Sequence, residues 1–172
     1  MIITNSNAED IGEIFSLYRV ATDFQKTKNI VLWPEFKQSL IETEIAENRQ
    51  WKILIDNEIA CIWAVAFSDP QIWGEQNADP AVYIHRIATN PKFRGQNLVA
   101  EIVEWAKKYA VDNQKQFIRM DTVGENKSLI SYYIKCGFDF IGLVKLIDTD
   151  GLPEHYHNAE VSLFEINLSD AD

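Results

Sequence analysis

The sequence predicts one domain of mixed α/β (α+β) class, built on a single central sheet. The chain has 172 residues, and 47% of them are hydrophobic, which suits one hydrophobic core and leaves little room for a second. Strand patterns and helix patterns are mixed along the whole length. No repeat, low-complexity tract or Pro/Gly/Ser-rich linker marks a boundary, so we expect one domain over residues 1–172.

The chain is predicted to open with a strand and two helices. Residues 1–4 have the composition of a short strand. Ser6 and Glu9 have the spacing of a capping box, and apolar residues recur behind them at helical spacing as far as Ala21. A second helix is expected over residues 34–46, because the proline that begins this range is tolerated in a first helical turn.

A hairpin and a third strand follow. Trp51–Ile55 and Ile59–Phe67 are strand-like, and the turn-prone pair Asp56-Asn57 between them predicts a hairpin. After a polar loop over residues 68–80, Ala81–Thr89 forms a strongly β-prone run that stops before a proline.

The second half begins with the clearest helix in the sequence. Apolar residues from Leu98 to Ala110 form one stripe, with most charged residues on the opposite side. The remaining elements are a strand over 117–122, a helix over 126–136 closed by Gly137, and final strands over 138–147 and 161–168.

Composition excludes several functions. The chain has 16 Lys and Arg against 26 Asp and Glu, a net charge of −10. This balance argues against a nucleic-acid or anionic-membrane surface, since both require clustered cations. It suits a cationic small molecule or peptide, although a solvated acidic surface is the commoner meaning.

Cysteines, apolar runs and the N-terminus complete this picture. Cys61 and Cys136 lack metal-ligand spacing and are expected to be reduced, buried thiols. No apolar run approaches the roughly 20 residues that cross a bilayer. The N-terminal residues lack the pattern of a signal peptide, so we expect a cytoplasmic protein. The cysteine spacing gives no reason to expect a metal.

The segment between Thr89 and Val99 predicts an anion site. A strand there runs through a turn containing Gly95 into the start of a helix, where free backbone N–H groups and the helix dipole favour a phosphate. Arg94 would add a cation that can bind the same anion through two hydrogen bonds. An ordinary capped helix with a surface arginine is the competing interpretation.

Two stretches resemble the GCN5-related N-acetyltransferases (the GNAT family). Tyr83–Thr89 followed by Asn90–Gly95 resembles the acyl-CoA-binding segment, whose motif is R/Q-x-x-G-x-G/A at a helix start. Asn126, Tyr133 seven residues later, and the pair Gly137-Phe138 match a second family pattern. The resemblance implies a mostly antiparallel sheet of about seven strands, with helices on both faces and strands 4 and 5 splayed apart.

The chain departs from the family motif at two positions. Asn97 stands where the family has glycine, and Val99 stands where it has glycine or alanine. Asparagine is the next best residue after glycine for a left-handed backbone, so position 97 is a mild substitution. Valine has no such conformational advantage at position 99; its branched side chain either joins the apolar stripe of the helix or alters the fit of the cofactor site.

The resemblance implies an acetyl-CoA-dependent N-acyltransferase, in which a primary amine of a small molecule or peptide attacks the thioester directly in a ternary complex. It also implies two groups of cofactor contacts. The backbone of the strand would pair with the pantetheine arm, and the amides of the turn would hold the pyrophosphate. The implied cofactor-binding residues are Ile87, Ala88, Thr89, Arg94, Gly95, Gln96, Asn97, Leu98, Val99, Asn126 and Tyr133.

The same resemblance implies roles in proton transfer. Tyr133 matches the family tyrosine that protonates the departing thiolate, while a plain core aromatic is the alternative. His85 is the first candidate for the base that accepts the proton of the amine, with a histidine satisfied within the sheet as the alternative. Tyr83 stands where arylalkylamine N-acetyltransferases carry the second histidine of a pair.

Further residues fall in regions that line the acceptor site in related folds. Phe24, Trp33, Trp63 and Trp73 are candidates for its wall, although most buried tryptophans belong to the core. His155 and His157 lie in the last polar loop, which comes near the acceptor side in the family, and are the runners-up to His85 as the base, with plain surface as the commoner role. Asp121 would orient a ligand amide or cap a turn. The predicted acceptor contacts are Trp33, Trp73, Tyr83 and His155.

Two other functions compete with catalysis. A non-catalytic acyl-CoA-binding or sensor domain would explain the changes at Asn97 and Val99 as a degenerate pyrophosphate turn. An interaction domain that kept the fold and no ligand would not explain the retained Arg94-Gly95 and Tyr133. A homodimer formed through the exposed final strands is a further expectation.

Overall fold

The computed structural model describes residues 1–28, 32–146, 150, 152, 156 and 159–170. Within these residues one sheet has seven strands in the order β1-β2-β3-β4-β5-β7-β6. The pairings β1–β2, β2–β3, β5–β7 and β6–β7 are antiparallel, whereas β4–β5 is parallel. This confirms the predicted mixed, mostly antiparallel sheet. The strands are β1 (Ile2–Asn5), β2 (Gln50–Ile55), β3 (Glu58–Ala66), β4 (Ala81–Thr89), β5 (Phe117–Val123), β6 (Asp139–Lys145) and β7 (Glu160–Asn167).

Helices separate most of these strands. The α-helices are α1 (Ile11–Thr27), α2 (Gln38–Ala46), α3 (Pro70–Trp73), α4 (Leu98–Asp112) and α5 (Lys127–Lys135), and the short 3-10 helices are η1 (Ala8–Asp10), η2 (Gly74–Ala78), η3 (Pro91–Phe93) and η5 (Leu168–Asp170). Among the described residues, no helix is both long and apolar enough to span a membrane.

Contacts divide the chain into two compact units. The first unit contains Met1–Val65 and His85–Leu98, and the second contains Ala66–Ile84 and Val99–Asp172. Strand β4 therefore contributes its first residues to the second unit and its last residues to the first. That the whole chain forms one domain stays a prediction.

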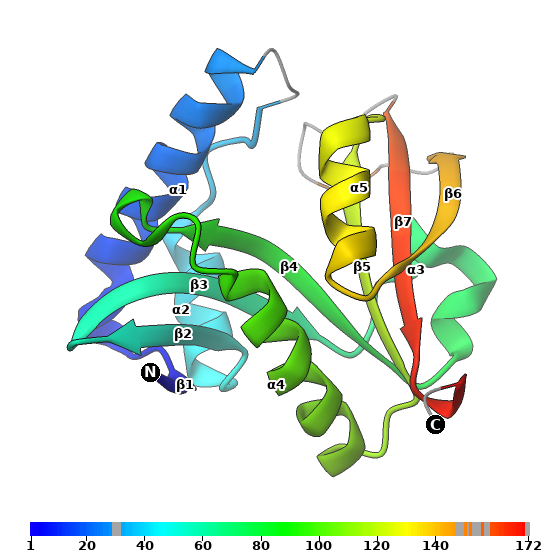
Figure 1. Ribbon diagram of the computed structural model, residues 1–172, viewed down its shortest axis with the longest axis horizontal. Coiled ribbons are helices and arrows are strands. Elements are labelled where there is room, and N and C mark those ends of the chain that lie inside the picture. The colour runs from blue at the N-terminus through cyan, green and yellow to red at the C-terminus, as the bar shows by residue number, and fades with distance from the viewer. Residues whose placement is uncertain (29–31, 147–149, 151, 153–155, 157–158, 171–172) are drawn as a thin grey trace. The chain divides into compact units, whose positions relative to one another are not determined.

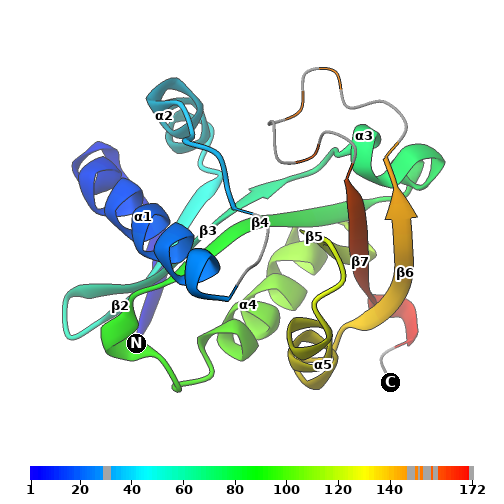
Figure 2. The same cartoon turned by 90° about the horizontal axis from the view of Figure 1, so that it is seen from above.

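In the first unit, helices α1 and α2 cover one face of the strands (Figure 2). Ile14 and Leu17 of α1 and Ile41 of α2 form a buried core with Ile62 of β3 and Ala88 of β4. The apolar residues whose spacing predicted α1 thus form the face that this helix buries. The hairpin between β2 and β3 is also confirmed, because Asp56 (φ 51°) and Asn57 (φ 64°) are both left-handed, as a two-residue turn of the favoured type requires.

The predicted start of the first helix is wrong by one residue. Asn7, rather than Ser6, is the cap: its side chain accepts from the Glu9 N–H (2.9 Å), and its own N–H donates to Asp10 (2.8 Å). Ser6 is 4% exposed, and its N–H donates to the Gln50 carbonyl. Ser6 therefore extends the backbone pairing of β1 with β2, and Asn7, the next residue, caps the helical segment.

Two further boundaries differ from the prediction. The second helix begins at Gln38 instead of residue 34, because Trp33 and Phe36 pack as a non-helical segment against Tyr18 of α1. The predicted polar loop over 68–80 contains α3 and η2. In both places tertiary packing overrides the local pattern.

In the second unit, helices α5 and α3 pack on opposite faces of β7 (Figure 1). Phe164 contacts Tyr133 of α5 with ring centroids 5.1 Å apart, whereas its neighbour Leu163 packs with Trp73 of α3. This alternation is the period of two expected of a strand buried on both faces. The parallel ladder of β4 with β5 covers only three residue pairs, from Ala81 opposite Phe117 to Tyr83 opposite Arg119, which agrees with the expectation that strands 4 and 5 splay apart.

Candidate active site

The segment after β4 is a tight turn that leads into α4. Asn90 fixes its beginning, because its side chain donates to the Ile59 carbonyl (3.0 Å) and accepts from the Lys92 N–H (3.1 Å). Phe93, at the end of η3, is buried. The turn from Arg94 to Asn97 therefore starts from a fixed point of the first unit and runs directly into the helix.

Two residues of this turn adopt the left-handed backbone conformation. Gly95 has φ 84° and Asn97 has φ 55°, the region that glycine and asparagine tolerate best. Asn97 thus adopts the left-handed conformation that the sequence predicts for it. Val99 is 7% exposed, so its branched side chain belongs to the core.

The geometry of the turn suits an anion. The first N–H groups of α4, a helix of 15 residues, have no carbonyl partner within the helix. Together with the helix dipole they place a partial positive charge just after Asn97. Arg94 is exposed, and its guanidinium carbon lies 4.8 Å from the ring centroid of Phe24 in α1. An aromatic ring thus holds a cation beside the turn.

The end of β4 is tied to the core of the first unit. Ala88 is 2% exposed and packs with α1 and α2. The Thr89 hydroxyl lies 3.5 Å from the Cys61 sulfur in β3. Ile87 is half-buried. The three residues predicted to contact the pantetheine arm therefore belong to one rigid stretch of backbone.

His85 and Arg86 are two polar residues in the second half of β4. Burial, together with the positive charges of Arg86 and Arg49, lowers the pKa of His85 to about 3. Arg86 has φ 52°, forms an ion pair with the buried Glu44, and lies 5.3 Å from the Phe36 ring. The His85 imidazole is consequently neutral at pH 7, but it is a weaker base than an ordinary histidine.

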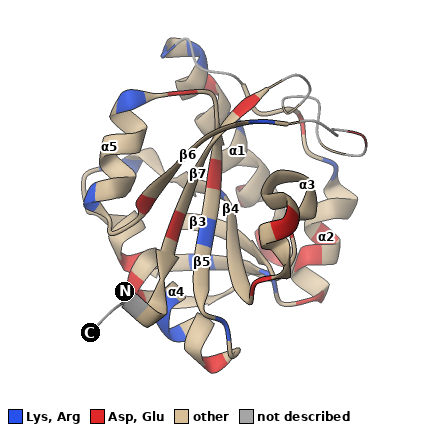
Figure 3. Ribbon diagram, turned by 90° about the vertical axis from the view of Figure 1, so that its right-hand side faces the viewer, with Lys and Arg blue, Asp and Glu red and all other residues tan. Residues whose placement is uncertain are grey.

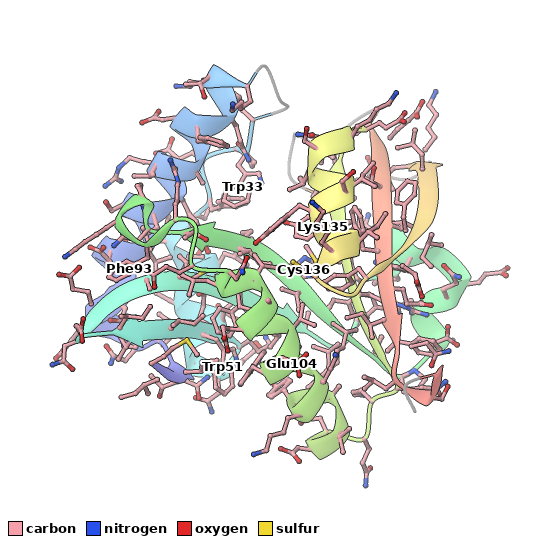
Figure 4. All side chains as sticks on the ribbon, in the orientation of Figure 1. Trp33, Trp51, Phe93, Glu104, Lys135 and Cys136 are labelled. Carbon is pink, nitrogen blue, oxygen red and sulfur yellow. The ribbon has the colours of Figure 1, made fainter. Side chains whose placement is uncertain are left out.

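Trp33 belongs to an aromatic group beside α1 (Figure 4). Its ring centroid lies 5.8 Å from that of Tyr18 and 6.0 Å from that of Phe36, and all these contacts are edge-to-face. Trp33 is half-buried. It is thus partly accessible, as a residue that contacts a ligand must be.

In the second unit, Asn126 and Tyr133 occupy two ends of α5. The Asn126 side chain caps the helix by accepting from the Leu129 N–H (3.1 Å). Tyr133 is 8% exposed and packs edge-to-face against Phe138 and Phe164. Gly137, with φ 109°, ends the helix as predicted. The spacing that carried the family resemblance therefore sets the start, the interior and the end of one short helix.

Trp73 and Tyr83, two predicted acceptor contacts, lie in the core of the second unit. Trp73 is 3% exposed and Tyr83 is fully buried. Arg119 joins them, because its guanidinium lies 4.7 Å from the Trp73 ring and donates to the Tyr83 hydroxyl (3.1 Å). Their burial favours the core interpretation that the sequence left open for Trp73, and it extends this interpretation to Tyr83.

Two carboxyl groups of the second unit carry raised pKa values. Burial raises the pKa of Asp121 to about 6, and burial with the nearby charge of Asp121 raises that of Asp69 to about 7. One oxygen of each lies within 4.8 Å of the other. The Tyr156 hydroxyl donates to Asp121 (3.1 Å). A carboxyl group with a pKa near 7 can take up or release a proton at neutral pH.

The predicted site residues divide between the two units. Ile87 to Leu98, His85 and Trp33 belong to the first unit, whereas Val99, Asn126, Tyr133, Trp73 and Tyr83 belong to the second. His155 and His157 lie outside the described residues. The sequence did not single out Asp69, although an Asp-Pro pair directly after a buried strand is a signal that could have drawn attention to it.

Comparison with known sequences points to one family. The model of the "Acetyltransferase (GNAT) family" matches residues 17–138, more than half of the chain. An "Uncharacterized N-acetyltransferase YesJ" of Bacillus subtilis is 34% identical over 43% of this chain and 41% of its own length. A streptothricin acetyltransferase of Escherichia coli is 32% identical over 51% of this chain and 52% of its own length. The chain thus matches about half, or less, of these two curated relatives.

Solved structures share the fold over nearly the whole chain. A GNAT-family acetyltransferase of Listeria monocytogenes superposes with a TM-score of 0.76, at 21% identity, covering 97% of this chain and 94% of its own. A putative acetyltransferase (yncA) of Salmonella typhimurium, solved with acetyl-CoA, has a TM-score of 0.68 at 10% identity, covering 98% of this chain and 94% of its own. At these identities the likeness concerns the fold.

Proposed function

The chain belongs to the acetyltransferase (GNAT) family, and from this premise we propose that it transfers the acetyl group of acetyl-CoA directly to a primary amine of a small molecule or peptide. The observation that carries the proposal is the turn from Arg94 to Asn97. Its two left-handed residues and the helix start behind it form an anion site of the kind that a diphosphate occupies.

The proposed cofactor contacts follow from the turn and the strand before it. The N–H groups from Arg94 to Val99 bind the pyrophosphate, with the Arg94 guanidinium as an additional donor. The backbone of Ile87 and Thr89 pairs with the amides of the pantetheine arm, and Ala88 between them anchors the strand in the core. Asn126 holds the start of α5, which presents Tyr133.

Tyr133 is the proposed proton donor to the CoA thiolate. Its ring is fixed by Phe138 and Phe164, so the hydroxyl does not have to be oriented during the reaction. A phenol hydroxyl can donate its proton to a departing thiolate. Attack by the amine forms the new C–N bond, the C–S bond breaks, and the phenol proton goes to sulfur.

The acceptor amine must lose a proton, and His85 is the proposed acceptor of that proton. Because its pKa is about 3, the neutral imidazole accepts a proton only transiently and has to pass it on. A pH profile of kcat/KM is therefore expected to show no inflection near the ordinary histidine value of about 6.5. Trp33 is the proposed aromatic contact of the acceptor.

The alternative function, a domain that binds acyl-CoA without turnover, loses much of its support. It rests on the two departures from the family motif, yet Asn97 adopts the conformation that a glycine would adopt, and Val99 is buried. Neither residue gives a physical reason for a failed cofactor site.

The test combines binding with turnover. Acetyl-CoA is expected to raise the unfolding temperature by mass action, and a panel of amines is expected to release free thiol from it. Tyr133→Phe should lower kcat by about tenfold to a hundredfold while leaving the acetyl-CoA Kd nearly unchanged. Binding without thiol release for any amine would favour the alternative, and absence of binding would exclude both.

We also propose that two copies pair through β6, the edge strand of the sheet. Four apolar side chains of β6 are 38–45% exposed, and the strand begins with Asp139 and ends with Lys145. The strand has a bulge between Phe140 and Gly142, and antiparallel self-pairing about Gly142 brings Asp139 of each copy close to Lys145 of the other. Exposed strand edges are ready templates for such pairing.

A further inference from the structure

Phe24 is an aromatic residue on the surface of the first unit. It lies in the last turns of α1 and is 44% exposed, so burial of its ring contributes little to the core. Two cations lie close to this ring: the Arg94 guanidinium carbon is 4.8 Å from its centroid, and the Lys28 ammonium is 5.6 Å from it. Both distances are within the range of a cation–π interaction.

Neither cation is neutralised by an acid. Within the described part of the chain, the side chains of Arg94 and Lys28 have no hydrogen-bonding or ion-pair partner. Lys92, two residues before Arg94, is different, because it forms an ion pair with Glu58 at 2.7 Å. Two unpaired positive charges on one ring, beside a turn of free N–H groups, leave a net positive charge that an anion can neutralise.

The ring also restricts the motion of Arg94. A free arginine loses much rotamer freedom when it binds an anion, whereas a guanidinium already stacked on a ring loses less. Stacking leaves the N–H groups at the edge of the guanidinium plane available for a phosphate. The contact therefore organises the cation before the ligand arrives.

We propose that Phe24 is a positioning residue of the cofactor site, which holds Arg94, with Lys28 beside it, for a phosphate group of acyl-CoA. This inference rests on the proposed function. It moves Phe24 from the wall of the acceptor site, where the family resemblance put it, to the cofactor turn. It also adds Lys28, which no sequence pattern had indicated.

The test measures acetyl-CoA binding by calorimetry, so that it does not depend on finding the acceptor amine. Phe24→Ala is expected to raise the acetyl-CoA Kd about fivefold, and Phe24→Tyr, which keeps an aromatic face, to restore most of the affinity. Arg94→Ala should raise the Kd more, by at least tenfold. Because Phe24 acts chiefly through Arg94, adding Phe24→Ala to Arg94→Ala should cost clearly less than the fivefold that it costs alone, with the remainder due to Lys28.

The chain offers a matched control in Phe67. This residue is 41% exposed, and the Lys115 ammonium lies 4.8 Å from its ring centroid. Phe67→Ala removes a similarly exposed ring with an equally close cation, but in the second unit, and should leave the Kd unchanged. S-acetylpantetheine, which carries no phosphate, provides the matching ligand control, since Phe24→Ala should not alter its affinity.

The possible results separate the two proposals. If the wild-type protein does not bind acetyl-CoA, the proposed function itself fails. If the wild type binds but Phe24→Ala binds equally well, or the Phe24 and Arg94 substitutions are additive, only the role of Phe24 is overturned. A Phe24→Tyr variant as weak as Phe24→Ala would also overturn it, because the aromatic face would then not be the cause.

Discussion

Arg94 in the first unit and Arg119 in the second both stack on aromatic rings, but their surroundings are opposite. Arg119 is 1% exposed and donates to Glu165 (2.8 Å), Asp79 (2.7 Å) and the Gln76 carbonyl (2.8 Å). Figure 3 shows the charged residues of β5 and β7 in this region. Arg94 is exposed and has only its ring contact among the described residues.

This difference separates a structural cation from a binding cation. The Nε and both Nη nitrogens of Arg119 donate to groups of the protein, so its charge holds β5, β7 and the segment around η2 together. Arg94 is held in place but keeps its donors available, which is what recognition of an anion requires. The ring contacts alone would not have revealed this, because both arginines have them.

The largest expected effect is on the stability of the Arg119 cluster. Arg119→Ala should lower the free energy of unfolding by about 3 kcal/mol, because Glu165 would keep a largely buried charge with no partner. Urea unfolding monitored by circular dichroism measures this. Arg119→Lys, which keeps the charge but lacks the planar fork, should lose less, and Arg94→Ala should change stability by under about 0.5 kcal/mol. Equal losses for the alanine variants at both positions would contradict the comparison.

A smaller effect is expected from Asp69 and Asp121, two carboxyl groups whose pKa values burial raises, whereas Glu165 accepts a hydrogen bond from the Arg119 guanidinium. Their pKa values, about 7 and about 6, exceed the unfolded value of about 3.9. The folded state therefore binds more protons, and stability decreases as the pH rises from about 4 to about 7. Asp69→Asn removes this loss and should raise the free energy of unfolding by roughly 1–2 kcal/mol at pH 8, with little effect at pH 4.

The matched variant is Asp79→Asn. Asp79 is a second carboxyl group of this unit, but it accepts a hydrogen bond from the buried Arg119 guanidinium and its side chain is 45% exposed. This substitution should destabilise the protein at pH 8, opposite in sign to Asp69→Asn. If the free energies of unfolding of wild type and Asp69→Asn differed by the same amount from pH 4 to pH 8, the Asp69 carboxyl group would have the same pKa in the folded and unfolded states, which would contradict the prediction.

Sequence reasoning succeeded where the cause of a structure is local. Strand Ala81–Thr89, the asparagine cap at Asn126 and the left-handed Asn97 depend on a few consecutive residues, and the structure confirms all three. The start of the first helix was wrong by one residue, because Ser6 contacts Gln50, a residue of another strand.

The features of the site that the sequence missed all depend on contacts distant in the chain. Phe24 meets Arg94, 70 residues further on, and the pKa of Asp69 is raised partly by Asp121. Periodicity describes the face of an element but not which residue another element brings to it. Tyr83 and Trp73 show the same limit, since their burial follows from Arg119, which no local pattern marked.

The smallest expected effect is at the proposed β6 contact, where the charges are exposed, in contrast to the buried pairs of Arg119. A cross-strand ion pair contributes about 0.2–1 kcal/mol, and self-pairing forms two of them. Asp139→Lys should place lysines opposite each other, Lys145→Asp should place aspartates opposite each other, and either change should weaken a dimer about tenfold or less. Analytical ultracentrifugation over a concentration series measures the dissociation constant.

The decisive result comes from mixing these two variants. One then carries two lysines and the other two aspartates at the paired positions, so a mixed dimer regains both attractions, and the double variant Asp139→Lys/Lys145→Asp regains them with itself. Loss in each single variant with recovery in the mixture requires antiparallel pairing of residue 139 with residue 145. Single variants that dimerise like the wild type, or a wild type that stays monomeric at high concentration, would show that the exposed charges of β6 serve solubility, as charged residues on edge strands commonly do.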